Sequence, residues 1–66
     1  MATAKFGTIL VVDNEIDVRS VVTEMIERIG FHVQDAADGA QAIASIKAGI
    51  NNLQAVLLDL YVTDVN

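Results

Sequence analysis

The sequence contains no cysteine, and this absence excludes disulfide bonds and metal sites built from thiolates. It also lacks an apolar stretch near the ~20 residues that cross a membrane, and no segment has the form of a secretory signal peptide. We therefore expect a cytoplasmic protein with no membrane partner.

Basic residues are scarce. Four Lys and Arg stand against nine Asp and Glu, so the formal net charge is −5. Nucleic acids and anionic membranes attract basic surfaces, so neither is the expected partner of this segment. Cations or basic patches on other proteins suit its charge better.

Repeats, low-complexity tracts and Pro/Gly/Ser-rich linkers are absent as well, so residues 1–66 are expected to form one domain. What is present is a core-forming composition, 53% hydrophobic with a mean hydropathy of +0.46. A chain of this size buries only ~60% of the surface that its unfolded form exposes, which makes its stability marginal and favours a partner subunit.

Apolar patterning in the first half predicts a strand and a helix. Residues 8–12 (TILVV) are a continuous apolar run closed by Asp13 and Asn14, which is typical of a strand buried on both faces of a parallel sheet. Apolar residues then recur at steps of three and four, which predicts an amphipathic helix over Ile16–Ile29 ended by Gly30. Its buried side is expected to be Val18, Val21, Val22, Met25, Ile26 and Ile29.

The next pair of elements is a strand and a second helix. Alternating apolar and polar residues predict a half-exposed edge strand over 31–36. Asp38 with Gln41 three positions later has the pattern of a capping box. The helix that follows is expected to end at Lys47 and Gly49, or to bend at Gly49 before Ile50. The buried side of this helix is expected to be Ala42, Ile43, Ile46 and Ile50.

A turn at residues 51–52 precedes residues 55–60 (AVLLDL), which we interpret as a second fully buried strand. The alternation of strands and helices predicts an α/β fold, with a parallel sheet and helices on its faces. In such sheets ligands bind beyond the carboxyl ends of the strands, where the strand order reverses. Asp13 and Asp59 end the first and third strands, and a strand order of 2-1-3 would make those strands neighbours about 4.8 Å apart. A cation would relieve the repulsion between the two acids, and Mg²⁺ suits one or two carboxylates.

Three motifs resemble those of the receiver domain of two-component response regulators: ILVVDNE at 9–15, AADG at 36–39 and VLLDL at 56–60. Their order and spacing over residues 7–66 are more specific than any one of them. The resemblance implies a flavodoxin-like fold of five strands and five helices, of which this chain would hold the N-terminal half: three parallel strands in the order 2-1-3 with a helix on each face. It also implies that a strand-end aspartate accepts a phosphoryl group from a sensor histidine kinase or a phosphotransfer protein. Such a domain is a phosphoacceptor and not an enzyme acting on other substrates.

By this resemblance Asp59 is the phosphoacceptor and Mg²⁺ is the cofactor. The ligands of the metal would be Asp13, Asn14, Asp59 and the backbone carbonyl of Tyr61. Asn14 stands where the family usually has a second aspartate, so we expect weakened Mg²⁺ binding. The family's Pro-Gly pair is replaced by Thr63 and Asp64, and no residue of the chain matches its switch Ser/Thr or its phosphate-binding Lys. We therefore expect a truncated receiver whose phosphorylation is impaired.

Plainer interpretations of the same residues are open. Asp13 and Asn14 could end a strand and cap the next helix, and we interpret Glu15 and Asp17 as complements of the helix dipole. For Asp13 and Asp59 a role in a site is favoured. An unpaired charge inside an apolar run is costly, and a second acid is predicted beside it.

Other functions fit less well. A phosphatase of the haloacid dehalogenase type needs a second aspartate where Tyr61 stands, and a dinucleotide-binding half-domain needs a Gly-rich loop after the first strand. The serious alternative is a self-associating structural module that carries no signal, because a 2-1-3 order leaves the third strand as a long hydrophobic edge. We therefore also expect a homo-oligomer formed through that strand.

Overall fold

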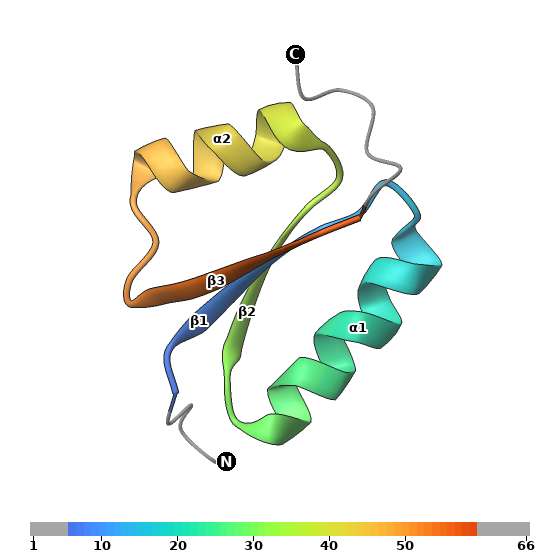
Figure 1. The fold of residues 1–66 in the computed structure, drawn as a ribbon. Helices are drawn as coiled ribbons and strands as arrows, with labels where there is room; N and C mark the ends of the chain where they lie inside the picture. Colours follow the sequence, from blue (N-terminus) through green and yellow to red (C-terminus); the bar gives the residue numbers. More distant parts are fainter. Residues whose placement is uncertain (1–5, 60–66) are drawn as a thin grey trace.

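The computed structural model describes residues 6–59, which form a three-stranded sheet and two helices. In chain order the elements are β1 (Thr8–Val12), α1 (Ile16–Ile29), β2 (His32–Ala36), α2 (Gly39–Ala48) and β3 (Leu53–Leu58). The strands are parallel and lie in the order β2-β1-β3, and the helices lie on opposite sides of the sheet (Figure 1). The predicted flavodoxin-like arrangement, with strand order 2-1-3 and a helix on each face, is confirmed.

The centre of the molecule is β1. All five of its residues are buried, because it pairs with a strand on each side and its apolar side chains meet a helix on each face. The cluster beneath α2 consists of Leu10, Val12, Ala36 and Ala42, with Ile50 and Leu53 packed against it.

The helix ends follow the sequence signals. Gly30 has a φ of 123°, which favours glycine, and its N–H donates to the carbonyl of Glu27 at the end of α1 (3.1 Å). At the start of α2, the Gln41 N–H donates to Asp38 Oδ1 (2.8 Å), as predicted. The reciprocal bond differs from a capping box, because Gln41 Oε1 accepts from the Ala37 N–H (3.0 Å) and not from the N–H of the cap residue itself.

Helix α1 packs on a narrower face than predicted. Its partly buried residues include Arg19, Val22, Thr23 and Ile26, whereas the remainder of the predicted buried side is exposed: Val18, Val21, Met25 and Ile29. The reason lies in the sheet beneath, since α1 contacts β1 and β2 but not β3. The apolar residues on the β3 side of the helix therefore have no surface to pack on.

The prediction that the third strand is fully buried is wrong. The strand runs over Leu53–Leu58, two residues earlier than expected, and the exposed fractions of Val56, Leu57 and Leu58 are 43%, 47% and 53%. Among the described residues neither helix contacts β3, and its outer edge pairs with no strand. Ile43 and Ile46 of α2 are half exposed for the same reason, so only Ala42 and Ile50 of that predicted buried side pack into the core.

Neither α1 nor α2 has the length and apolar character that a membrane-crossing helix needs.

Candidate functional site

The two acids singled out in the sequence come together at the carboxyl ends of neighbouring strands. Val12 lies opposite Leu58, and the N–H of Asp59 donates to the carbonyl of Val12 (3.1 Å), which continues the β1–β3 ladder to the ends of both strands. Asp13 and Asp59 therefore follow the two strands at the same level, on backbones about 4.8 Å apart.

This alignment follows an irregularity at the other end of the same ladder. Thr8 lies opposite Leu53, but Ile9 lies opposite Ala55, so β3 contains one residue, Gln54, that has no counterpart on β1. From Ile9 onward the register is regular. Such an extra residue is a β-bulge, which is rare between parallel strands.

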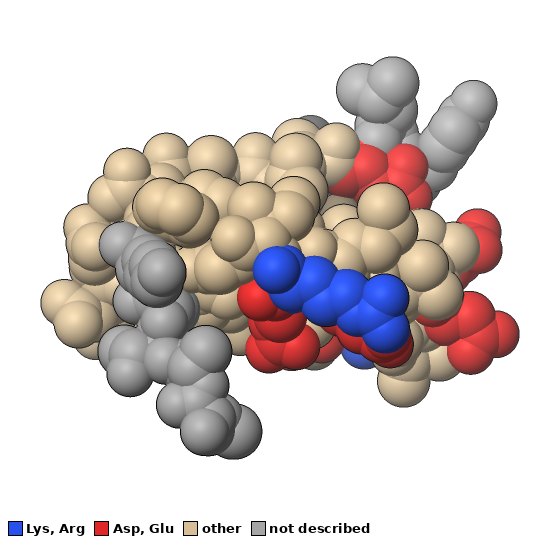
Figure 2. Space-filling model, turned by 90° about the horizontal axis from the view of Figure 1, so that it is seen from below, with Lys and Arg blue, Asp and Glu red and all other residues tan. Residues whose placement is uncertain are grey.

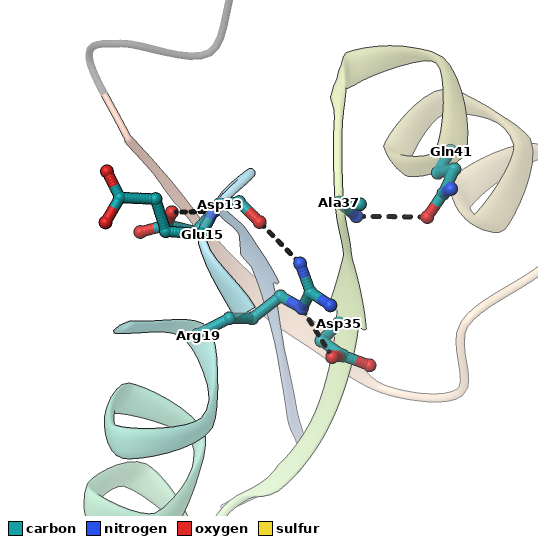
Figure 3. Close-up of polar contacts among 6 residues, drawn as sticks. All are labelled: Asp13, Glu15, Arg19, Asp35, Ala37 and Gln41. Carbon is teal, nitrogen blue, oxygen red and sulfur yellow. Dashed lines mark hydrogen bonds and ion pairs between the residues drawn. The ribbon is translucent and has the colours of Figure 1, made fainter. Parts of the chain in front are cut away.

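Asp13 is held by three neighbouring segments. It is 7% exposed, and its N–H donates to the carbonyl of Ala36 in β2 (3.1 Å). One carboxylate oxygen, Oδ1, accepts from the Glu15 N–H (2.8 Å), and the Asp13 carbonyl accepts from Nη1 of Arg19 (2.7 Å; Figure 3). Asp13 thus closes the turn between β1 and α1, which agrees with the plainer interpretation that it ends a strand. The helix itself begins after Glu15, whose side chain makes no capping bond.

Asp59 is half-buried, and it shares an open hollow of about 300 Å³ with Asp13. The rest of the lining is apolar and comes from β1, α1 and β3: Val11, Val12, Val18, Val22, Leu57 and Leu58. Two carboxylates at the rim of an apolar wall experience a lower effective dielectric constant than in bulk water, which strengthens their interaction with a cation.

Arg19 supports this site, and the sequence analysis did not identify it. Its Nε donates to Asp35 Oδ2 on β2 (2.8 Å), while Nη1 holds the Asp13 carbonyl; Figure 3 shows the side chain reaching from α1 to both. Only 14% of the side chain is exposed. Its spacing in the sequence could have identified it. Arg19 precedes Val22 by three residues and Ile26 by seven, so it lies on the same helix face as these two.

Neither of the other two predicted ligands is among the described residues that line the hollow. Asn14 is exposed in the turn after β1, and Tyr61 lies outside the described residues. Glu15 and Asp17 are exposed at the start of α1, where acids complement the helix dipole. That interpretation of both residues fits their position.

The donor atoms of this site suit a divalent cation that keeps part of its water. Within residues 6–59 no group of three or more His, Cys, Asp or Glu side chains is placed to hold a metal, so a cation would rest on two carboxylates. Mg²⁺ commonly takes one or two carboxylates and fills its other positions with water and phosphate oxygens. Asp13 and Asp59 fit that requirement, with the amide oxygen of Asn14 as the nearest further ligand in sequence.

Comparisons of the chain with protein-family models, with curated proteins and with solved structures found no match. The fold and site define a class by themselves: an α/β protein with two acids at the carboxyl ends of adjacent parallel strands, beside the point where strand order reverses. The resemblance to receiver domains stays a prediction.

Proposed function

We propose that this chain is a receiver-like phosphoacceptor of two-component signalling, in which Asp59 accepts a phosphoryl group. The observation that carries the proposal is the alignment of Asp13 with Asp59 at the switch point of a parallel sheet. Mg²⁺ would be held by Asp13, Asn14 and Asp59, together with the carbonyl of Tyr61 that the receiver resemblance implies. The three motifs that resemble receivers support the same function.

The proposed reaction is a displacement at phosphorus. A carboxylate oxygen of Asp59 attacks the phosphorus of a phosphohistidine, the P–O bond forms as the P–N bond breaks, and the electron pair of the P–N bond remains on the imidazole nitrogen. The other ring nitrogen carries a proton, so the donor leaves as neutral imidazole. Asp13 would hold and orient the ligand, and the apolar wall would limit access of water. A bound Mg²⁺ would neutralise the charge that otherwise keeps two anions apart.

The partner would be a sensor histidine kinase or a phosphotransfer protein, and the chain would act in the cytoplasm without contacting nucleic acid or membrane through this segment. We expect the transfer to be slow. Asn14 adds no negative charge to the metal site. Lys47 lies in the last turn of α2, which leads to the start of β3, whereas Asp59 follows the end of that strand. The guanidinium of Arg19 already donates to Asp35 and to the Asp13 carbonyl, so we do not expect it to replace the family's phosphate-binding Lys.

The test uses the whole chain with Mg²⁺ and then acetyl phosphate as a small phosphodonor. Tyr61 is the sole tyrosine, and the sequence has no tryptophan, so its fluorescence reports on the surroundings of Asp59 two residues away. We expect a Mg²⁺-dependent change in fluorescence and the addition of one phosphoryl group by intact mass. Asp59→Asn should abolish the added mass, while Asp17→Asn, an exposed acid nearby, should keep it. Equal labelling of Asp59→Asn would refute the proposal.

Asn14 offers a second test of the same site. Asn14→Asp adds a carboxylate to the turn after β1, so we expect Mg²⁺ affinity to rise severalfold because the site gains one negative charge. Isothermal titration of the two proteins measures the difference. Equal affinity would show that residue 14 does not reach the metal.

The alternative is a self-associating module that carries no signal, and the exposed β3 favours it. The two functions differ in one readout. A chain of this second kind would show neither a fluorescence response to Mg²⁺ nor transfer from acetyl phosphate.

A further inference from the structure

Strand β3 is uncovered on three sides in the described part of the chain. Neither α1 nor α2 contacts it; Leu53 packs against the core, but residues 54–58 are exposed, and β1 occupies only one edge of the strand. Five of its six residues are exposed. The strand nevertheless has the composition of a core element, with four large apolar residues among six.

The hydrogen-bonding groups on the open edge can be assigned from the ladder with β1. Asp59 directs its N–H to the Val12 carbonyl. On a strand, the N–H and C=O of one residue point to one edge, and those of the next residue point to the other edge. The backbone groups of Leu57 therefore also face β1, while those of Val56 and Leu58 face the open edge. Val56 is the outward-facing residue nearest the middle of β3.

We propose that a second copy of this chain binds the open edge, with the two β3 strands antiparallel about a twofold axis that passes between the Val56 residues of the two subunits. In an antiparallel ladder, directly opposed residues point both of their backbone groups either toward each other or away. Val56 opposite Val56 of the partner subunit satisfies this rule, and the pair exchanges two N–H···O bonds. The result is a six-stranded sheet, and the interface is isologous, as in most dimers.

The charges of the chain favour a copy of itself at this edge. Its net charge is −5, yet β3 (LQAVLL) carries no charged residue, so pairing β3 with itself brings no like charges into the ladder. In the proposed register Asp59 lies opposite Leu53 of the partner subunit, and the two Asp59 residues lie at opposite ends of the interface. Figure 2 shows charged side chains gathered on the half of the molecule that holds α1, beside a broad uncharged area on the other half.

The described residues offer an apolar surface for such an interface. Val56, Leu57 and Leu58 on β3 are 43%, 47% and 53% exposed, and Val18 of α1, which lines one hollow with Leu57 and Leu58, is 42% exposed. A standard interface buries about 800 Å² of each partner, and these side chains flank the edge at which the second copy would bind.

The first test is the mass of the whole chain in solution, measured by sedimentation equilibrium over a range of concentrations. We expect a dimer, with twice the 7.1 kDa of one chain. Val56→Pro removes an N–H that points away from β1 and should raise the dissociation constant at least about tenfold, because the two hydrogen bonds at the axis are lost. Val56→Ala keeps the N–H and should remain a dimer. Circular dichroism of Val56→Pro establishes that the monomer is folded.

A second test does not depend on how well the proline variant folds. The chain has no cysteine, so a single introduced cysteine can form a disulfide only between copies. Opposed residues in a hydrogen-bonded antiparallel pair have Cα atoms about 5.5 Å apart, within the range of about 4.4–6.8 Å that a disulfide spans. Val56→Cys should therefore cross-link rapidly under mild oxidation. Leu57→Cys, which lies opposite Ala55 of the partner subunit, should cross-link slowly.

A folded monomer at micromolar concentration would overturn the proposal, whichever part of the chain then covers β3. Equal cross-linking at positions 56 and 57 would overturn the register, and a larger assembly that survives Val56→Pro would overturn the closed twofold pairing. None of these outcomes depends on phosphorylation of Asp59. The dimer and the proposed function can therefore fail separately.

Discussion

The two outer strands of the sheet differ in protection, since β2 is covered and charged whereas β3 is neither. Both helices contact β2, and its Asp35 is paired with Arg19, so this edge strand combines cover with charge. Neither helix contacts β3, which carries no charge at all. Charged residues and covering elements are the usual means by which a sheet prevents its edges from pairing with other chains.

Because of this difference, the residues that stabilise the fold and the residues exposed to partners lie in different parts of a very small domain. The packing that holds the fold together lies between β1, β2 and the two helices, where the fully buried residues are found. The surface left for partners lies on β3, which also leads directly to Asp59. Mutations in the two halves should therefore have different effects, and the predictions below run from the largest expected change in unfolding free energy to the smallest.

The largest contrast is between a leucine in the covered half and one on β3. Leu10 is fully buried, and Leu10→Ala should lower the unfolding free energy by about 2–5 kcal/mol. Leu57 is 47% exposed, and Leu57→Ala should lower it by less than about 1 kcal/mol in the dissociated chain. Urea unfolding at low protein concentration measures both. Equal losses would mean that β3 is covered in the monomer.

A second contrast concerns the two arginines of α1. Arg19→Ala removes bonds to Asp35 and to the Asp13 carbonyl from a side chain that is only 14% exposed, so we expect a loss of about 1.5–3 kcal/mol. Arg28 is 77% exposed and pairs with Glu24 one turn away, so Arg28→Ala should cost no more than about 0.5 kcal/mol. Similar losses in thermal unfolding would contradict a special role for Arg19.

The helix caps provide a third contrast. Asp38→Ala deletes the oxygen that accepts from the Gln41 N–H at the start of α2, and should cost about 1 kcal/mol. Glu15 occupies the corresponding position of α1 but makes no side-chain cap, so Glu15→Ala should change stability by less than about 0.5 kcal/mol. A larger effect at Glu15 would show that its charge, and not a hydrogen bond, supports α1.

The last contrast is similar in size to the cap at Asp38 but includes a gain in stability. The Thr23 hydroxyl is buried under α1 without a hydrogen-bond partner, so Thr23→Val should raise the unfolding free energy by about 1 kcal/mol. Thr8→Val is the matched control, because the Thr8 hydroxyl donates to the Asn51 carbonyl (3.0 Å) and its removal should be destabilising by a similar amount. Urea titrations of both variants test the pair, and a loss at position 23 would show that its hydroxyl is satisfied in solution.

The features predicted well from sequence are those that depend on local pattern. The bounds of α1, the end of the helix at Gly30 and the cap at Asp38 each rest on a few neighbouring residues, and all three are confirmed. The parallel sheet follows from the alternation of elements, and β1 is buried as its apolar run predicts. Convergence of Asp13 and Asp59 then follows from the strand order.

The features predicted poorly depend on what lies next to an element. An apolar run such as LQAVLL has the same pattern at the centre of a sheet as at its edge, so its pattern alone could not reveal that β3 is exposed. The apolar stripe of α1 is wide, and the strands beneath decide which part of it packs. Arg19 was missed for the same reason, since its role depends on hydrogen bonds to Asp35 and Asp13, which lie outside α1.

The unpaired Gln54 gives the chain an uneven tolerance to insertions and deletions. Removing Gln54 would restore a regular ladder between β1 and the start of β3 and leave Asp59 level with Asp13. Removing any one residue from 56–58 would place Leu60 level with Asp13 instead and turn the remaining strand residues to the opposite face. The position of the acid pair is therefore encoded by the number of residues between Ala55 and Asp59 as much as by their identity.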